Sequence, residues 1–335
     1  MKRLFISLLI VSCLAASAQD LHLSQFYTSP LNINPATAGS FVGDYRLMTN
    51  YKSQWAGISK GYRTVMASYD MKVFSPKSKR WNYLAAGLSF MGDKAGMSRM
   101  GSMQTDLDIA YNLGITRHQS LCVGVRTGFA QRSISVAGLK WDNQFDGNTY
   151  DSNLSTGQNT IGETTQYLDL GAGLDYKYDN YTSKFHFNLG ASAFHLHEPK
   201  ISFLGNSQRL YRKYIGHAMI QVPIMKSHYY IVPQFIYSMQ GPYQEIVAGA
   251  YFRYVFGMDN EGAILNTYTL ISSYVQIGAL YRTGDALVII ASVEMRKALS
   301  FGISYDLNVS KLKAASRMRG GLEVSLSYKG AFKNK

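Results

Sequence analysis

Charged and apolar side chains separate onto opposite sides of long alternating segments in this chain. In residues 166–179, QYLDLGAGLDYKYD, Leu168, Leu170 and Leu174 share one side of an extended strand, and Asp169 and Asp175 share the other. One side of this strand therefore avoids water while the other carries charge. The apolar side faces either a protein core or lipid, and the rest of the chain has to decide which.

The same separation recurs along the chain. Charged residues share one parity within their segments in these pairs: Arg46 and Lys52, Asp70 and Lys72, Asp106 and Asp108, Arg126 and Arg132, Glu245 and Arg253, Glu294 and Arg296, and Glu323 and Lys329. In a barrel strand, a Lys or Arg at mid-depth costs about 2–4 kcal/mol on the lipid side and little in the lumen. The parity therefore favours lipid, and it predicts that a cation at position 170 disrupts assembly whereas one at position 169 is tolerated.

Segment length favours the same interpretation. Fourteen candidate strands lie near 43–53, 61–74, 81–92, 102–115, 118–133, 164–178, 182–196, 209–224, 227–240, 244–257, 272–283, 286–297, 299–309 and 317–330. Strands of soluble sheets usually have about five or six residues, whereas a tilted strand needs about ten to cross a bilayer. We expect an all-β fold, a single transmembrane antiparallel β-barrel of about 14 strands. A soluble β-sandwich is the alternative, and an even strand number predicts both chain ends at the periplasmic side.

Composition excludes two other classes. Charged residues make up 16% of the chain, and no run of eighteen apolar residues follows the N-terminus, which excludes a bundle of transmembrane helices. The formal charge of +13 is spread along the chain without a recognition motif, so nucleic-acid binding is not expected.

The first eighteen residues have the pattern of an export signal. Lys2 and Arg3 precede an apolar stretch, and Ala16-Ser17-Ala18 forms a small-x-small cleavage site before Gln19. A lipoprotein signal is the rival interpretation, because Ile10-Val11-Ser12-Cys13 loosely fits a lipobox. We expect a signal peptide at 1–18, a periplasmic or lumenal segment at 19–42, a barrel in the cell outer membrane at 43–330, and a tail at 331–335.

Candidates for catalysis or metal binding are weak. His195 and His197 lie on one side of a strand end beside Glu198, which suggests either a metal site or polar residues at a barrel rim. Residues 142–153 have a partial calcium-loop register, but the twelfth position is Asn153 instead of Glu. We expect no enzyme activity and no cofactor, and bound calcium stays an alternative for this loop.

Two segments are candidates for partner binding. The connection 134–163 is the longest one expected outside the cell, and exposed aromatic groups favour interfaces. Its candidate residues are Trp141, Asp142, Asn143, Phe145, Asp146 and Tyr150. The second segment, 24–41, contributes Phe26, Tyr27, Asn34 and Pro35. Because its apolar groups need cover, we expect it to pack against the periplasmic mouth of the barrel or to enter the lumen.

Ten pieces of the chain carry a family resemblance. They are SQFYTSPLNINPATAG (24–39), NYKSQWAGI (50–58), SYD (68–70), FMGDKAG (90–96), GFAQRSI (128–134), LKWDNQFDG (139–147), DLGAGLDY (169–176), YRTGDA (281–286), SYDLNVSKL (304–312) and GGLEVSLSY (320–328). In this order and spacing the set resembles the PorP/SprF family of outer-membrane proteins linked to type IX secretion in Bacteroidetes. Lys52 stands where the family often has Arg, which keeps the charge.

The resemblance implies a non-enzymatic barrel that supports secretion or surface anchoring of a partner protein such as an adhesin. Its expected partners are that protein, other type IX secretion components and outer-membrane lipid. The alternative is a channel for small solutes, since barrels of about eight strands are filled and those of sixteen or more are open. Bulky inward-facing residues, such as Met66, Met219 and Gln221, indicate a partly filled lumen.

Overall fold

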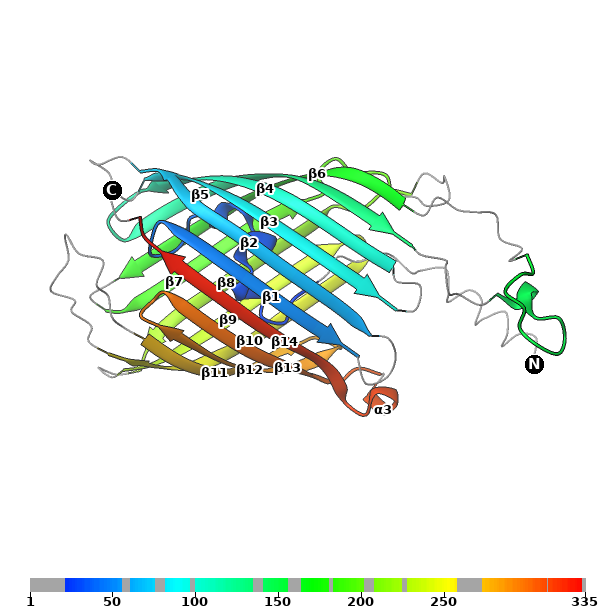
Figure 1. The fold of residues 1–335 in the computed structure, drawn as a ribbon. Helices are drawn as coiled ribbons and strands as arrows, with labels where there is room; N and C mark the ends of the chain where they lie inside the picture. Colours follow the sequence, from blue (N-terminus) through cyan, green and yellow to red (C-terminus); the bar gives the residue numbers. More distant parts are fainter. Residues whose placement is uncertain are drawn as a thin grey trace.

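The computed structural model describes residues 22–55, 61–75, 82–96, 100–134, 141–155, 164–180, 183–201, 208–224, 228–257, 273–311 and 313–332. They form a closed barrel of fourteen strands, which confirms the predicted fold class (Figure 1). The strands are β1 (Tyr45–Gln54), β2 (Tyr62–Phe74), β3 (Tyr83–Ala95), β4 (Met100–Gly114), β5 (Gln119–Ser133), β6 (Thr164–Asn180), β7 (Phe185–Phe194), β8 (Lys213–Pro223), β9 (Tyr229–Gln240), β10 (Tyr243–Phe256), β11 (Ser273–Arg282), β12 (Ala286–Met295), β13 (Leu299–Asn308) and β14 (Arg319–Gly330). The expected signal peptide and the whole of 258–271, in the β10–β11 connection, lie outside the described residues.

Every strand pairs antiparallel with its neighbours in the chain, and β1 pairs with β14 to close the ring. Strand β8 begins at Lys213 and not at 209, because residues 208–210 pair back onto residues 199–201. The short helix α3 (Lys313–Ser316) lies in the β13–β14 connection. No helix in the described part of the chain is long and apolar enough to span a membrane.

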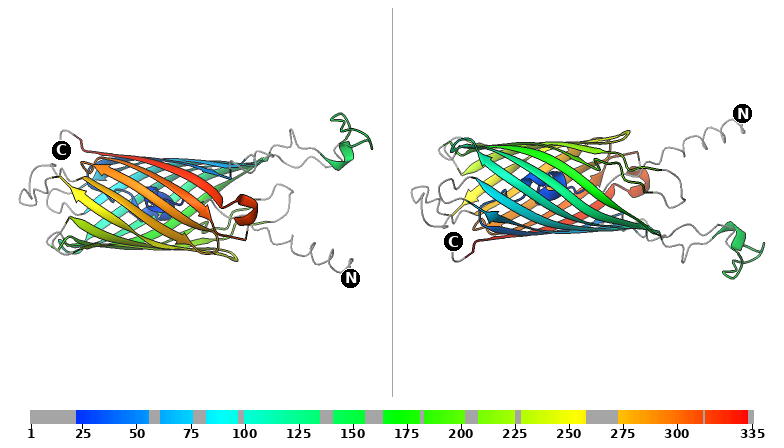
Figure 2. Two further views of the ribbon diagram at one scale, coloured as in Figure 1. Left: turned by 90° about the horizontal axis from the view of Figure 1, so that it is seen from below. Right: turned by 90° about the horizontal axis from the view of Figure 1, so that it is seen from above.

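The barrel has two different rims. At the first, which we call the chain-end rim, β1 begins and β14 ends, and the backbone N–H of Asp44 donates to the carbonyl of Gly330 at 2.8 Å. At the second, the loop rim, β5 ends and β6 begins, and the described residues of the long β5–β6 connection lie beyond it (Figures 1 and 2). Odd-numbered strands therefore run toward the loop rim and even-numbered strands run away from it.

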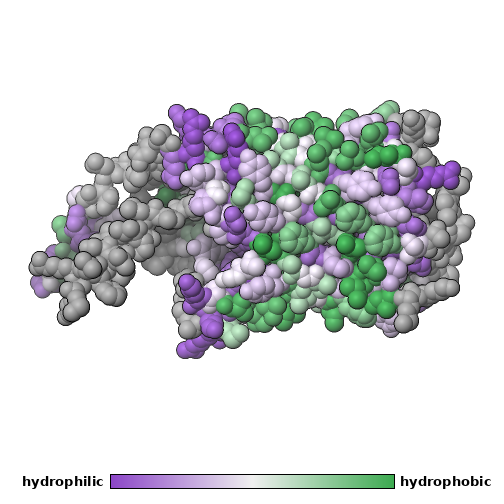
Figure 3. All heavy atoms as spheres, turned by 180° about the vertical axis from the view of Figure 1, so that it is seen from behind, coloured by the Kyte–Doolittle hydropathy of each residue, from purple (hydrophilic) through white to green (hydrophobic). Residues whose placement is uncertain are grey.

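Burial alternates along the strands as the charge parity predicts. Asp169 is fully buried on the lumenal side of β6, and Leu170 is 43% exposed on the outer side. Hydrophobic side chains spread over the middle of the outer wall, and hydrophilic ones gather toward the rims (Figure 3). Aromatic rings cluster near the chain-end rim, where Tyr45 lies 6.2 Å from Tyr328 and Tyr229 lies 5.1 Å from Tyr254. Such rings are typical of the girdles at a membrane surface.

The lumen contains the start of the described chain. Residues 22–41, which we call the lumenal segment, run inside the barrel and form η2 (Phe26–Thr28), α2 (Pro30–Ile33) and η3 (Pro35–Thr37) (Figure 1). Pro30 and Pro35 each occupy the first position of a helical turn, where the missing N–H has no helical partner to lose. These turns pair some of the backbone groups of a segment that no strand can pair.

The route of the lumenal segment corrects one expectation. An even strand number places the start of β1 and the end of β14 at the same rim, as predicted. The segment before β1, however, crosses the lumen, and its first described residue, His22, lies near the loop rim beside Glu245 at the start of β10. The two ends of the described chain therefore lie at opposite rims, because the segment returns through the barrel instead of staying at the chain-end rim.

Candidate docking loop and lumenal segment

Residues 141–155, which we call the rim loop, fold around the side chain of Gln144. The amide oxygen of Gln144 accepts from the backbone N–H of Trp141 at 3.2 Å and from the hydroxyl of Tyr150 at 3.1 Å. Its amide nitrogen donates to the carbonyls of Ser152 at 3.4 Å and Leu154 at 3.3 Å. One buried glutamine thus ties together both ends of the rim loop and one of its aromatic residues.

A tight turn forms the tip of the rim loop. Phe145 and Tyr150 make an isolated antiparallel bridge, and between them the carboxylate of Asp146 accepts from the backbone N–H groups of Thr149 at 2.7 Å and Asn148 at 2.8 Å. These hydrogen bonds, the Thr149 bond first, lower the pKa of Asp146 below its ordinary value, because they favour the ionised carboxylate. The ionised carboxylate of Asp146 therefore holds the backbone of the turn in place.

The rim loop presents aromatic and acidic groups to solvent. Phe145 is 57% exposed and Tyr150 is 38% exposed. Asp142, Asn143 and Asp146 are exposed as well, whereas Trp141 is half-buried. Residues 141–155 include three Asp and neither Lys nor Arg. The predicted loop residues are thus brought together in one folded loop, which carries a net negative charge from its three Asp.

Gln144 is the residue of the rim loop that sequence reasoning missed. Its role depends on carbonyls eight and ten residues further along the chain, and no local pattern marks a glutamine as such a centre. The only available signal was its position between Asp142 and Asp146, which suggested a calcium register instead.

The geometry gives the metal hypotheses no support. The described residues contain no group of three or more His, Cys, Asp or Glu side chains placed to hold a metal ion. In the rim loop, Asp146 is occupied by backbone N–H groups. At the other candidate, His195 is buried with its Nδ1 2.8 Å from Asp169, while Glu198 pairs at 3.4 Å with Arg212. His197 is exposed, so the two histidines lie in different environments.

At the loop-rim end, the lumenal segment is held by an ionic network. The backbone N–H of Ser24 donates to Glu323 at 2.7 Å, and its hydroxyl donates to Asp306 at 2.8 Å. Lys52 donates to the Ser24 hydroxyl at 3.1 Å, and Arg282 forms an ion pair with Asp306 at 2.8 Å. Arg282 also donates to the Ser24 hydroxyl at 3.3 Å. These partners come from β14, β13, β1 and β11, so the single residue Ser24 links four strands, including both strands of the closing seam.

In the middle of the barrel, Asn34 is the polar centre of the lumenal segment. Its amide nitrogen donates to the carbonyl of Leu174 at 2.8 Å, and its amide oxygen caps η3 by accepting from the N–H of Ala36 at 3.0 Å. Glycines on the wall allow this close approach. A Cβ added at Gly124 would overlap the backbone of Ala36, and one added at Gly173 would overlap the Asn34 side chain.

Toward the chain-end rim, Asp70 anchors the segment. Its carboxylate accepts two bonds from the Arg46 guanidinium, at 2.9 and 2.8 Å, and one from the backbone N–H of Gly39 at 2.8 Å. Gly39 has a φ of +71°, a conformation that costs other residues free energy. The ion pair of Arg46 and Asp70 is buried, so losing either side chain would leave the other as an unpaired buried charge.

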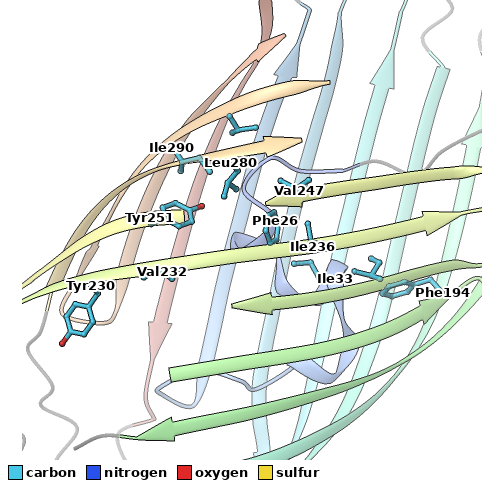
Figure 4. Packing of buried hydrophobic residues seen from close by; sticks show 12 residues of the cluster. Phe26, Ile33, Phe194, Tyr230, Val232, Ile236, Val247, Tyr251, Leu280 and Ile290 are labelled. Carbon is cyan, nitrogen blue, oxygen red and sulfur yellow. The ribbon is translucent and has the colours of Figure 1, made fainter. Parts of the chain in front are cut away.

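One side of the lumen is apolar. Phe26 and Ile33 of the lumenal segment pack with inward-facing residues of β7 to β12 (Figure 4). The wall members of this cluster are Phe194, Ile215, Tyr230, Val232, Ile236, Val247, Tyr251, Leu280, Val288 and Ile290. Met219 packs against the same cluster, Met66 is buried, and Gln221 accepts from Arg253 at 2.5 Å. The lumenal segment thus meets an apolar wall on one side and ion pairs on the other.

The predicted residues of the lumenal segment face the barrel itself. Phe26, Asn34 and Pro35 are buried and Tyr27 is half-buried. Their observed neighbours are strands of the same chain. Only the rim loop places its predicted residues where another molecule can reach them.

Comparisons with known proteins yield one family and a set of distant structures. A family model described as "Type IX secretion system membrane protein PorP/SprF" matches residues 15–328. A search of the curated proteins finds no match. Among solved structures, the chain is similar to the CymD monoaromatic hydrocarbon channel, with 10% identity over 91% of this chain and 93% of that one and a TM-score of 0.49. It is also similar to CdiB from Escherichia coli, with 7% identity over 84% and 63% of the two chains and a TM-score of 0.43.

Proposed function

The chain belongs to the PorP/SprF family of type IX secretion system membrane proteins, and from this premise we propose that it is a plugged outer-membrane barrel that docks a secreted or surface-held protein through its rim loop. The family membership and the membrane β-barrel give the setting. The docking role is our assignment, and it depends on what the rim loop presents.

The observation that carries the proposal is the order of the rim loop. A loop that serves only as a connection needs no buried glutamine making four hydrogen bonds. This one holds Phe145 and Tyr150 side by side in an exposed position. Exposed aromatic groups on a fixed backbone bind partners at a low entropic cost, because the surface is already ordered.

The filled lumen supports docking over solute transport. The lumenal segment is bonded to the wall at the loop-rim end, in the middle and toward the chain-end rim, through Ser24, Asn34 and Gly39. A solute path would require these contacts to break together. We therefore expect little ion conductance from the purified protein in planar bilayers, and a steady large conductance would favour the channel alternative.

The experiment that tests docking removes most of the rim loop without touching the strands. Deletion of residues 146–160 is expected to leave barrel insertion intact, measured by heat-modifiable gel mobility, and to reduce retention of the partner at the surface. The double variant Phe145→Ser and Tyr150→Ser is a milder form of the same test. If the partner is still secreted and retained at normal levels in both strains, the docking role is wrong.

A further inference from the structure

Two cations lie directly opposite each other on the outer wall, close to the loop rim. Arg63 of β2 pairs in register with Lys94 of β3. The next residues, Thr64 and Asp93, form the corresponding inner pair, in which the Thr64 hydroxyl donates to Asp93 at 2.7 Å in a buried position. Because successive residues of a strand point to opposite sides, the side chains of Arg63 and Lys94 point outward, and both are exposed.

This pair of cations is unfavourable without an anion. Side chains directly opposite each other on an antiparallel pair have Cβ atoms about 4.5–5.5 Å apart, and like charges at these positions are destabilising. Neither Arg63 nor Lys94 forms an ion pair or a side-chain hydrogen bond in the part of the chain that the structure describes. An anion between the two side chains would remove the repulsion and accept hydrogen bonds from both.

Further cations lie at the same rim beside the closing seam. The backbone N–H of Trp55, which follows β1, donates to the carbonyl of Gly320 at 3.0 Å, so the start of β14 lies next to the end of β1 and two strands from Arg63. The β13–β14 connection, with α3, lies at this end of the barrel (Figure 1). Between 311 and 319 it has no acidic residue and four exposed cations, which form no ion pair with a described residue: Lys311, Lys313, Arg317 and Arg319.

The outward rows of β2 and β3 pass from these cations directly into the apolar wall. The next outward residue after Arg63 is Val65, which is 46% exposed. On β3, Phe90 lies two outward positions from Lys94 and is 37% exposed. Arg63 and Lys94 therefore lie at the edge of the apolar band, where long basic side chains extend toward lipid head groups.

We propose that Arg63 and Lys94, together with the four cations of the β13–β14 connection, bind the phosphate groups of lipid A, the phosphorylated glycolipid of the outer leaflet. Guanidinium and ammonium groups are strong hydrogen-bond donors to phosphate. A lipid fits better than an acidic protein, because Arg63 and Lys94 belong to the wall that lipid surrounds. The inference takes from the proposed function only its orientation, with the loop rim at the cell surface, and not the docking role of the rim loop.

The test measures binding of lipid A to the purified full-length protein in detergent, by native mass spectrometry over a lipid A titration. The double variant Arg63→Gln and Lys94→Gln is expected to bind lipid A at least about tenfold more weakly than the wild type. The matched control is Arg117→Gln with Arg296→Gln, which removes the same charge from exposed turns at the chain-end rim. This control should bind lipid A as the wild type does.

Dephosphorylated lipid A and phosphatidylglycerol are titrated against the wild type, so the test does not depend on the folding of a variant. Both should bind more weakly than lipid A. Equally tight binding of either lipid overturns the proposal, as does tight binding of inorganic phosphate alone. Unchanged lipid A binding by the Arg63 and Lys94 double variant, with loss of an acidic protein from the isolated complex, would assign these cations to a protein contact instead.

The docking role and lipid binding can fail separately. Deletion of residues 146–160 leaves the proposed lipid contacts in place, so that variant should bind lipid A normally whether or not it retains the surface partner. The double variant Arg63→Gln and Lys94→Gln leaves the rim loop unchanged. Loss of lipid A binding after the loop deletion would show that the lipid contacts lie in the rim loop, which overturns the proposal.

Discussion

Asp169 and Leu170 are neighbours in β6, and their side chains lie in opposite environments. Asp169 is fully buried in the lumen, 2.8 Å from His195, while Leu170 is 43% exposed on the outer wall. This step from charge to lipid within one residue is the alternation that the whole barrel repeats.

The outer position gives the first prediction. Leu170→Arg places a cation in lipid and is expected to cost about 2–4 kcal/mol if the site is at mid-depth. The yield of folded barrel, measured by heat-modifiable gel mobility, should fall sharply, while the control Leu170→Phe should fold normally. Equal yields of the two variants would show that Leu170 does not face lipid.

The inner position leads to an expectation that differs from the one drawn from the sequence. Charge parity alone suggested that Asp169→Arg is tolerated, because a cation at this position stays out of the lipid. In the structure, Asp169 is fully buried against His195 and receives a bond from Gln104 at 3.4 Å, so a longer cation would displace these partners. We therefore expect Asp169→Arg to lower the yield as well, for steric reasons.

The second prediction concerns the anchor at Asp70. Asp70→Asn leaves the enclosed Arg46 without its ionic partner, and removing one member of a buried pair typically costs about 3–5 kcal/mol. The midpoint of unfolding in denaturant should fall accordingly. The matched control is Glu198→Gln, which breaks an exposed pair with Arg212 and should cost no more than about 1 kcal/mol. A similar small effect in both variants would contradict the anchoring role.

The third prediction uses the close approach at Gly124. Gly124→Ala pushes a methyl group into the backbone of Ala36 and is expected to destabilise the packed lumen by about 1–3 kcal/mol. Because the lumenal segment is displaced, conductance in planar bilayers should also rise. Gly216→Ala is the control, since no atom lies within 4 Å of the added Cβ. If the Gly124→Ala variant is as stable as the control and conducts as little current, the lumenal segment does not seal the barrel.

The fourth prediction concerns the rim loop. Gln144→Ala removes four hydrogen bonds, so the loop should become sensitive to protease while the barrel remains folded. Retention of the surface partner should fall in parallel. Asn148→Ala, at an exposed position in the same loop, should change neither measurement. If the loop of the Gln144→Ala variant is cut by protease but the partner is still retained at the surface, docking does not depend on the ordered conformation of the loop.

The fifth prediction is a pH dependence of the rim loop. Because the pKa of Asp146 is lowered in the folded loop, its cap contributes fully above the ordinary carboxyl pKa of about 3.9 and is lost as the pH falls through the lowered value. Trp141 fluorescence should therefore stay constant from neutral pH to about pH 5 and change only in stronger acid. The Asp146→Asn variant should lack this acid transition. A transition near neutral pH would assign the change to another group.

The sequence by itself determined the strands, their number and the side of each that faces lipid. These properties are encoded residue by residue, since a two-residue alternation and the cost of a charge in lipid are local. The tertiary structure decided the route of the lumenal segment and the role of Gln144. Ser24 finds its partner Glu323 299 positions along the chain, and Asn34 finds Leu174 140 positions along. No local pattern records such pairings, because they arise only when the closing barrel brings distant strands around the segment.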